Sequence, residues 1–161
     1  MIKVLVIDSL PRWEYRFLRN ALERDPGVDL QCLLFHPGMP TGFGQNYRRS
    51  FPKEMDQLAP FDVIFVGDVG IGNGELSEEN CAMLKKLVQQ QASGLVFLPG
   101  KRGRQLTLQN SPLADLLPVV LDAEKPNGLG TVNPSNLELT NRGKDHWLTN
   151  LRGAGEPDRE F

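Results

Sequence analysis

Two aspartates stand at the ends of apolar runs of the kind that form buried strands. Asp8 directly follows residues 2–7, and Asp68 stands two positions after residues 62–66. If these runs are neighbouring parallel strands, both carboxylates lie at the same edge of the sheet. Paired carboxylates can hold a hard cation such as Mg²⁺ or act as an acid and base pair. The competing interpretation is that each carboxylate accepts hydrogen bonds from the backbone N–H groups of the adjoining turn.

Further charged side chains are candidates for a ligand-binding rim around these two aspartates. Arg12 and Glu14 open a predicted helix just after the first aspartate, and Lys101 and Arg102 follow a later apolar run. The competing interpretation is a set of solvated charges with weak local ion pairs. The sequence thus proposes one candidate ligand rim, which consists of Asp8, Arg12, Glu14, Asp68, Lys101 and Arg102.

Other residue types that carry chemistry fall into no recognised motif. The glycine-rich segment 67–74 could cradle an anion with successive N–H groups, but it lacks the spacing of nucleotide-binding loops and also fits a simple connection. His36 and His146 lie in no triad pattern, and there is no G-x-S-x-G turn. Cys32 and Cys81 form no C-x-x-C pair, although their pairing with each other stays open. We therefore predict no catalytic residue, no metal site and no cofactor.

The bulk composition is that of an ordinary globular chain. Its 161 residues are 40% hydrophobic and 24% charged, with a formal net charge of -2. This charge gives no general attraction to nucleic acid, so no nucleic-acid partner is expected. No apolar stretch is long enough to cross a bilayer, and the N-terminus has no signal-peptide pattern. By default, the sequence predicts a soluble, cytoplasmic domain.

The order of the predicted elements indicates the fold class. Four apolar runs, the first of them rich in β-branched residues, predict buried strands, and they occupy residues 2–7, 28–35, 62–66 and 95–98. Helical spacing after Pro11 and after the N-cap candidate Ser77 predicts connecting helices between them. Asn80 stands where a capping-box residue belongs. This alternation predicts an α/β fold with a mostly parallel sheet in the order 2-1-3-4 and helices on both faces.

Some segments are assigned less directly. Trp13 and Phe17 lie four positions apart on the first helix, and we expect them to pack in the core. Residues 36–60 read as a long loop with a short helical turn near residues 53–58. The whole chain, 1–161, reads as one α/β domain. Its C-terminal part is predicted to hold a helical turn at 112–117, strands at 118–121 and 137–139, and a helix at 144–151.

The sequence resembles the class I glutamine amidotransferase-like domains of bacterial, planctomycete-type membrane-associated proteins. The run Pro-Arg-Trp-Glu-Tyr-Arg at residues 11–16 is the most specific part of the resemblance. The other matching segments are generic for the fold, and they extend to about Leu121; they are residues 4–35, 61–68, 94–100 and 111–118. The resemblance implies a three-layer, flavodoxin-like arrangement of the sheet and its helices. Working enzymes of this family keep a cysteine nucleophile on a tight turn after a central strand, with a later His-x-Glu.

This chain departs from the family at those catalytic positions. The turn after residues 95–98 reads Leu-Pro-Gly-Lys-Arg-Gly and holds no cysteine, and Asp145-His146-Trp147 is not His-x-Glu. The thiolate is the group that attacks the glutamine amide, so the resemblance extends to the fold and not to the activity. We therefore expect a non-catalytic binding or interaction module. The resemblance also implies a segment, incomplete at its C-terminus, of a longer membrane-attached protein whose other domains would be its partners.

Two alternatives stay open at the level of sequence. One is an enzyme that uses Asp8 and Asp68 at the rim of the sheet. The other is a receiver-like signalling domain, since Asp68 follows a strand and Lys125-Pro126 is similar to the lysine-proline pair of receivers. Against the receiver, Ser9 stands where a second acidic residue would be expected. A bound Mg²⁺ or phosphoryl group at Asp68 would distinguish these alternatives from an interaction module.

Overall fold

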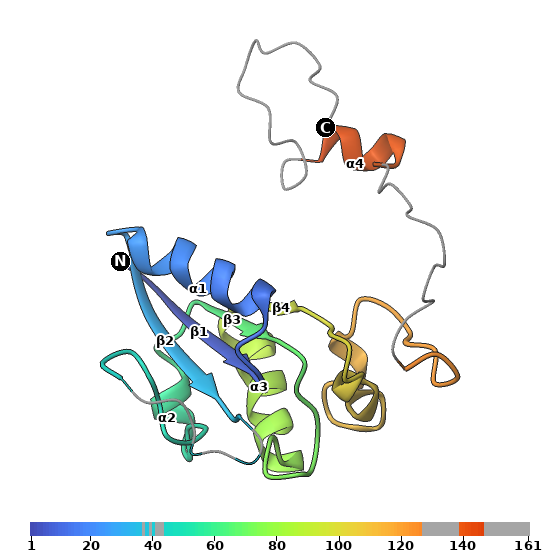
Figure 1. The fold of residues 1–161 in the computed structure, drawn as a ribbon, viewed down its shortest axis with the longest axis horizontal. Helices are drawn as coiled ribbons and strands as arrows, with labels where there is room; N and C mark the ends of the chain where they lie inside the picture. The colour runs from blue at the N-terminus through green and yellow to red at the C-terminus, as the bar shows by residue number, and fades with distance from the viewer. Residues whose placement is uncertain (37, 39, 41–43, 127–138, 147–161) are drawn as a thin grey trace. The chain divides into compact units, whose positions relative to one another are not determined.

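The computed structural model describes residues 1–36, 38, 40, 44–126 and 139–146 (Figure 1). The chain forms two compact units, Met1–Leu129 and Gly130–Phe161. In the second unit the structure describes a short helix, α4 (Asn141–Asp145), whose N-cap Thr140 accepts a hydrogen bond from the N–H of Gly143. All the features discussed below belong to the first unit. Within the described residues, no helix combines the length and the apolar character needed to cross a bilayer.

The first unit is built on four strands that pair in parallel throughout. They are β1 (Ile2–Asp8), β2 (Val28–Leu34), β3 (Val63–Val66) and β4 (Gly94–Phe97), and their order in the sheet is β2-β1-β3-β4. The predicted α/β class, parallel pairing and strand order are confirmed. The two central strands, β1 and β3, are almost continuously apolar because a central parallel strand is covered on both faces and needs no polar side.

Helices connect the strands in the predicted order. The helix before β4 begins with a capping box, in which the Ser77 hydroxyl accepts from the N–H of Asn80 and the Asn80 side chain accepts from the N–H of Ser77. This confirms the predicted N-cap. The helical elements of the first unit are α1 (Trp13–Arg24), α2 (Met55–Leu58), α3 (Glu78–Gln91) and the 3₁₀ helices η1 (Arg104–Asn110) and η2 (Ala114–Leu116).

Alternate residues of β1 belong to two separate apolar clusters. Leu5 and Ile7 pack with residues of α2, α3 and η1, and we call this cluster the α3-side core. Val4 and Val6 pack with Tyr15 of α1, and we call this cluster the α1-side core. Because successive strand side chains point to opposite faces, the two cores lie on opposite faces of the sheet. Figure 1 shows α1 and α3 on either side of the strands.

The prediction that Trp13 and Phe17 pack in the core is wrong. Their exposed fractions are 70% and 67%, and their rings stack on each other with centroids 5.9 Å apart. The buried residue of this helix is Tyr15, followed on the same face by the partly buried Leu18 and Leu22. Both sets have helical spacing, and the sheet packs against the second set, so spacing alone did not reveal the phase of the helix.

The segments between and after the strands match the predictions in part. The helical turns near 53–58 and within 112–117 are confirmed by α2 and η2. The strand predicted at 118–121 is wrong: the side chain of Gln109 brackets the backbone of Leu121 there, accepting from its N–H and donating to its carbonyl. Most of the predicted strand at 137–139 and of the predicted helix at 144–151 cannot be compared, because residues 137–138 and 147–151 lie outside the described residues. Within the long loop, Tyr47 forms an isolated parallel bridge with Cys32 of β2.

The burial of α1 predicts stability losses of different size for two aromatic residues on the same helix. Tyr15→Ala should lower the free energy of unfolding by about 3 kcal/mol, because it removes a buried aromatic side chain and leaves a cavity. Trp13→Ala should lower it by less than about 1 kcal/mol, because that ring is solvent-exposed. Urea unfolding followed by circular dichroism measures both values. A larger loss for Trp13→Ala than for Tyr15→Ala would contradict the observed phase of the helix.

Candidate functional site

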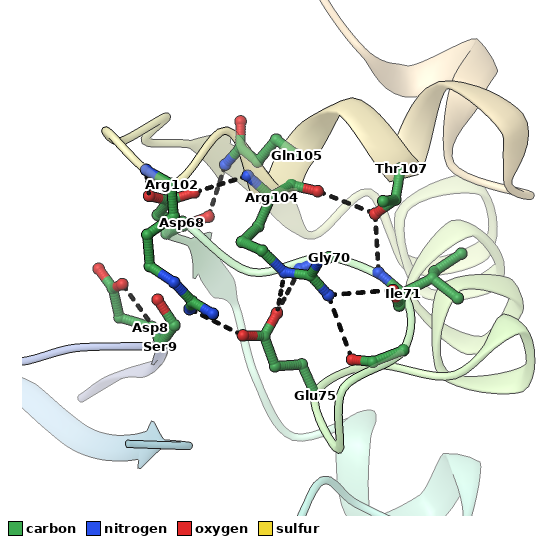
Figure 2. Close-up of polar contacts among 12 residues, drawn as sticks. Asp8, Ser9, Asp68, Gly70, Ile71, Glu75, Arg102, Arg104, Gln105 and Thr107 are labelled. Atoms are coloured by element: carbon green, nitrogen blue, oxygen red, sulfur yellow. Dashed lines mark hydrogen bonds and ion pairs between the residues drawn. The ribbon is translucent and has the colours of Figure 1, made fainter. Parts of the chain in front are cut away.

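The carboxyl edge of the sheet holds both candidate aspartates, and each is already bound by protein groups. Asp8 ends β1, and its carboxylate accepts hydrogen bonds from the N–H of Ser9 at 2.7 Å and from Nε of Arg12 at 2.8 Å. Asp68 follows β3 at the same edge, as the pairing of β1 with β3 requires. Both aspartates are only 2% exposed. Figure 2 shows that the dashed interactions of each lead to other groups, not to its fellow aspartate.

Arg12 joins the end of β1 to the end of β4. Besides its ion pair with Asp8, its guanidinium donates to the carbonyl of Leu98 at 2.6 Å and to that of Pro99 at 3.0 Å. One planar side chain therefore satisfies a buried carboxylate and two backbone acceptors at once. Glu14 lies 3.9 Å from the same guanidinium, but its side chain is mostly exposed, so this contact is weak.

Burial dominates the electrostatics of Asp8. Removal of its carboxylate from water raises the pKa of Asp8 above the ordinary value, and the hydrogen bond and charge of Arg12 offset only part of that rise. The ion pair therefore compensates a desolvation cost rather than creating a strongly acidic group. A buried carboxylate that is paired with a guanidinium in this way stabilises the edge of the sheet.

Asp68 binds the turn that follows β4. One carboxylate oxygen accepts from the N–H of Arg102 at 2.7 Å, and the other accepts from the N–H of Arg104 at 2.9 Å. The competing interpretation of the sequence placed backbone N–H groups on this carboxylate, but in the adjoining turn. The donors instead come from a turn more than thirty residues further along the chain. Asp68 thus holds the turn after β4 against the end of β3.

Two glycines allow the backbone to approach these carboxylates. A Cβ atom at Gly67 would lie 2.2 Å from Oδ2 of Asp8, and one at Gly100 would lie 2.5 Å from Oδ2 of Asp68. Both distances are far inside van der Waals contact, so any side chain at these positions would displace a buried carboxylate. The glycines after β3 and after β4 are thus required by close packing.

Glu75 is the central acidic residue of the edge, and the sequence analysis did not identify it. Its fully buried side chain accepts from Nη1 of Arg102 at 2.8 Å, from Nε of Arg104 at 3.0 Å and from the N–H of Gly70 at 2.9 Å. Figure 2 shows the two arginine side chains reaching this carboxylate. The available signal was an acid directly after the glycine-rich segment 67–74 and a Lys-Arg-Gly-Arg cluster at residues 101–104, but nothing local links them.

The glycine-rich segment 67–74 is a structural connection. Its N–H groups at Gly67, Gly70, Ile71 and Gly72 donate to Ile7, Glu75, Thr107 and Leu76 respectively. Since these donors are bound within the protein, the segment does not present them to an anion. Gln105 closes the same region, because its Nε2 donates to the carbonyl of Val66 at 2.8 Å and to that of Gly67 at 2.6 Å.

The other candidate residues do not join this network. The side chain of Lys101 is exposed, and among the described residues no hydrogen bond or ion pair joins it to the buried acids. His36 follows β2 with a left-handed φ of 46°. Cys32 in β2 and Cys81 in α3 are buried free thiols in opposite cores, so they do not pair. In the described part of the chain, no group of three or more His, Cys, Asp or Glu side chains could hold a metal ion.

A pocket of about 360 Å³ opens beside Asp68. Asp68 and Gln105, at the hydrogen-bonded carboxyl edge of the sheet, form part of its wall, and the segment before Pro126 forms the other side. Gly103, with a left-handed φ of 63°, brings these two walls together, since a Cβ there would lie 2.4 Å from the carbonyl oxygen of Pro126. The remaining lining residues are Gly100, Leu106, Val120, Leu121, Asp122 and Lys125.

The burial of Glu75 predicts a large effect from a small change. Glu75→Gln should lower the free energy of unfolding by about 3 kcal/mol, because it leaves two guanidinium groups without their anion in a partly buried site. Asp115→Asn is the matched control, since that carboxylate pairs with Lys85 but is mostly exposed, and we expect no measurable loss. Thermal and urea unfolding compare the two variants. Equal stability losses would show that Glu75 does not organise the edge.

Comparison with protein-family models, with curated proteins and with solved structures found no match to this chain. The geometry of the site is then what indicates its role. In that geometry, the buried acids bind the turns of the sheet edge to one another. The pocket beside Asp68 adjoins this hydrogen-bonded edge.

Proposed function

We propose that this chain is a non-catalytic domain with a glutamine amidotransferase-like fold, and that it acts as a binding or interaction module within a larger protein. The observation that carries the proposal is that protein donors hold the acidic groups at the carboxyl edge. Asp8, Asp68 and Glu75 each accept hydrogen bonds from at least two protein donors. In open parallel sheets this edge is the usual place for ligands and chemistry, and here its acids hold the structure together.

Carboxylates that hold buried protein donors are poorly suited to catalysis. A general base needs a lone pair directed at the substrate, and a metal ligand needs one directed at the ion. Freeing Asp68 would require two backbone N–H groups to lose their acceptor, and freeing Glu75 would leave two arginines unpaired. Both changes cost free energy because the groups are buried.

The thiols give no substitute for the nucleophile of an amidotransferase. Burial raises the pKa of Cys32, and it raises the pKa of Cys81 to about 11, so both thiols stay protonated near neutral pH. Neither residue lies in the turn after β4, where the resemblance would place a nucleophile. That turn instead supplies N–H donors and arginine side chains to the buried acids.

The fold supports the resemblance at a coarse level. A parallel sheet in the order β2-β1-β3-β4 has its reversal of strand order between β1 and β3, as a flavodoxin-like sheet does. The two cores on opposite faces are what a three-layer arrangement requires. These features favour the flavodoxin-like arrangement as part of the proposal.

A receiver-like signalling domain is the second candidate, and one observation favours it. Asp68 and Lys125 line the same pocket, as the acceptor aspartate and the lysine of a receiver would. Two contacts weigh against it. Arg12 occupies the carboxylate of Asp8, where a receiver would bind Mg²⁺ with a pair of acids. Both oxygens of Asp68 accept backbone hydrogen bonds, which would have to be given up or shared for phosphoryl transfer.

The non-catalytic proposal predicts that the purified chain will release no ammonia from glutamine above the background rate. It also predicts that a thiol reagent such as dithionitrobenzoate will modify Cys32 and Cys81 only after unfolding, because both thiols are buried and protonated. The unfolded chain in guanidinium is the control, in which both thiols should react. Glutamine hydrolysis that is lost on alkylation of one thiol would overturn the proposal.

The contacts of Asp68 also predict the outcome of a phosphorylation assay. Incubation with acetyl phosphate and Mg²⁺ should leave the intact mass unchanged, because the carboxylate is held by two N–H groups at the buried edge. The Asp68→Asn variant is the control for modification at any other site, and circular dichroism checks that it is folded. A phosphorylated species in the unsubstituted chain that is absent from the variant would favour the receiver over the module.

A further inference from the structure

A second pocket, of about 480 Å³, lies at the outer edge of β2, which is the opposite edge of the sheet from β4. Its walls are the first half of β2 and the segment 45–50. Two backbone bonds hold that segment on the strand. The N–H of Cys32 donates to the carbonyl of Asn46, and the N–H of Arg48 donates to the carbonyl of Cys32, both at 2.7 Å. The pocket is therefore preformed, as ligand sites usually are.

Arg48 brings a cation without an anion to this pocket. Its side chain is partly buried, and Nη1 donates to the neutral amide of Gln31 at 2.7 Å. The Nε atom is buried and has no acceptor. Among the described residues, no carboxylate forms an ion pair with this guanidinium. A partly buried guanidinium without a counter-ion has lost hydration that nothing replaces, which favours the binding of a carboxylate.

Asp29 brings an unpaired charge of the opposite sign to the same pocket. It stands two positions before Gln31 on β2, so the two side chains point to the same face of the sheet. Its side chain is partly buried and lines the pocket. In the described part of the chain, no group donates to its carboxylate, and it forms no ion pair with Arg48. The pocket thus presents an acid and a base that do not neutralise each other.

We propose that this pocket binds a small polar amino acid as its zwitterion, with the carboxylate on Arg48 and the ammonium on Asp29. The inference rests on the proposed binding function and names the ligand class for it. Hydrogen bonds between charged groups are about twice as strong as neutral ones, and a zwitterion forms them with both residues. A ligand with a single charge would leave one of the two pocket charges without a partner. The amides of Gln45 and Asn46 also line the pocket and suit a polar ligand side chain.

L-Serine, N-acetyl-L-serine and L-serinamide form a matched set of probes. They share a side chain, but the second lacks the ammonium and the third lacks the carboxylate. We expect L-serine to bind saturably to the full chain, with shifts in the ¹⁵N-correlated spectrum confined to residues around Gln31 and Arg48. Each single-charge probe should bind at least about tenfold more weakly, because it leaves one charge unpaired. Equal affinities of L-serine and either other probe, or no saturable binding of L-serine, would overturn the inference.

Two variants assign the two charges of the ligand. Asp29→Asn should weaken L-serine binding about tenfold and should not weaken the binding of N-acetyl-L-serine, because only the ammonium loses its partner. Arg48→Gln should weaken the binding of both probes, because both carry the carboxylate. Asp56→Asn is the control: this residue is exposed, lies outside the pocket lining and should leave the affinities unchanged.

The design separates loss of binding from loss of the fold. Asp29→Asn changes a side chain without a protein partner, so this variant should stay folded, and circular dichroism checks all three. Equal affinities of the three variants for L-serine would refute the site, and a loss of N-acetyl-L-serine binding in Asp29→Asn would refute the place of the ammonium. Failure of L-serine would leave the non-catalytic module standing, since glutamine hydrolysis and thiol reactivity test that proposal without a ligand.

Discussion

The folded structure depends on how the carboxyl edge of the sheet accommodates three buried acids. A carboxylate without water must receive several hydrogen bonds or lose its charge. Asp68 and Glu75 receive most of theirs from a single turn, because Arg102 and Arg104 give their backbone N–H groups to the first acid and their side chains to the second. The turn after β4 is therefore folded back over β3 by charge compensation as well as by apolar contact.

Other features of the edge follow from that constraint. The turn can reach Asp68 only if Gly100 carries no side chain, and Asp8 fits beside β3 only because Gly67 carries none. Arg12 then ties the far end of β4 to β1, so that three of the four strands end in one connected network. Removing one member would leave a buried partner unsatisfied, which makes the network cooperative rather than a sum of separate contacts.

The sequence predicted what depends on local pattern and missed what depends on distant contacts. Apolar runs predict buried parallel strands, and a serine three positions before an asparagine predicts the capping box of α3. The phase of α1 was misread, because Trp13 and Phe17 have helical spacing but it is Tyr15 that packs on the sheet. Glu75 was missed because its two arginine partners lie 27 and 29 residues away in the chain.

The same compensation that stabilises the edge directs any ligand away from its acids. The acids at the reversal of strand order hold buried donors, and the turn that could have carried a nucleophile is committed to those acids. Gln105 also serves the end of β3, because its Nε2 donates to the carbonyls of Val66 and Gly67. It lines a largely apolar hollow next to the rigid network. Binding beside such a network requires no rearrangement of buried charges, which is the physical reason to connect this fold with recognition rather than with catalysis.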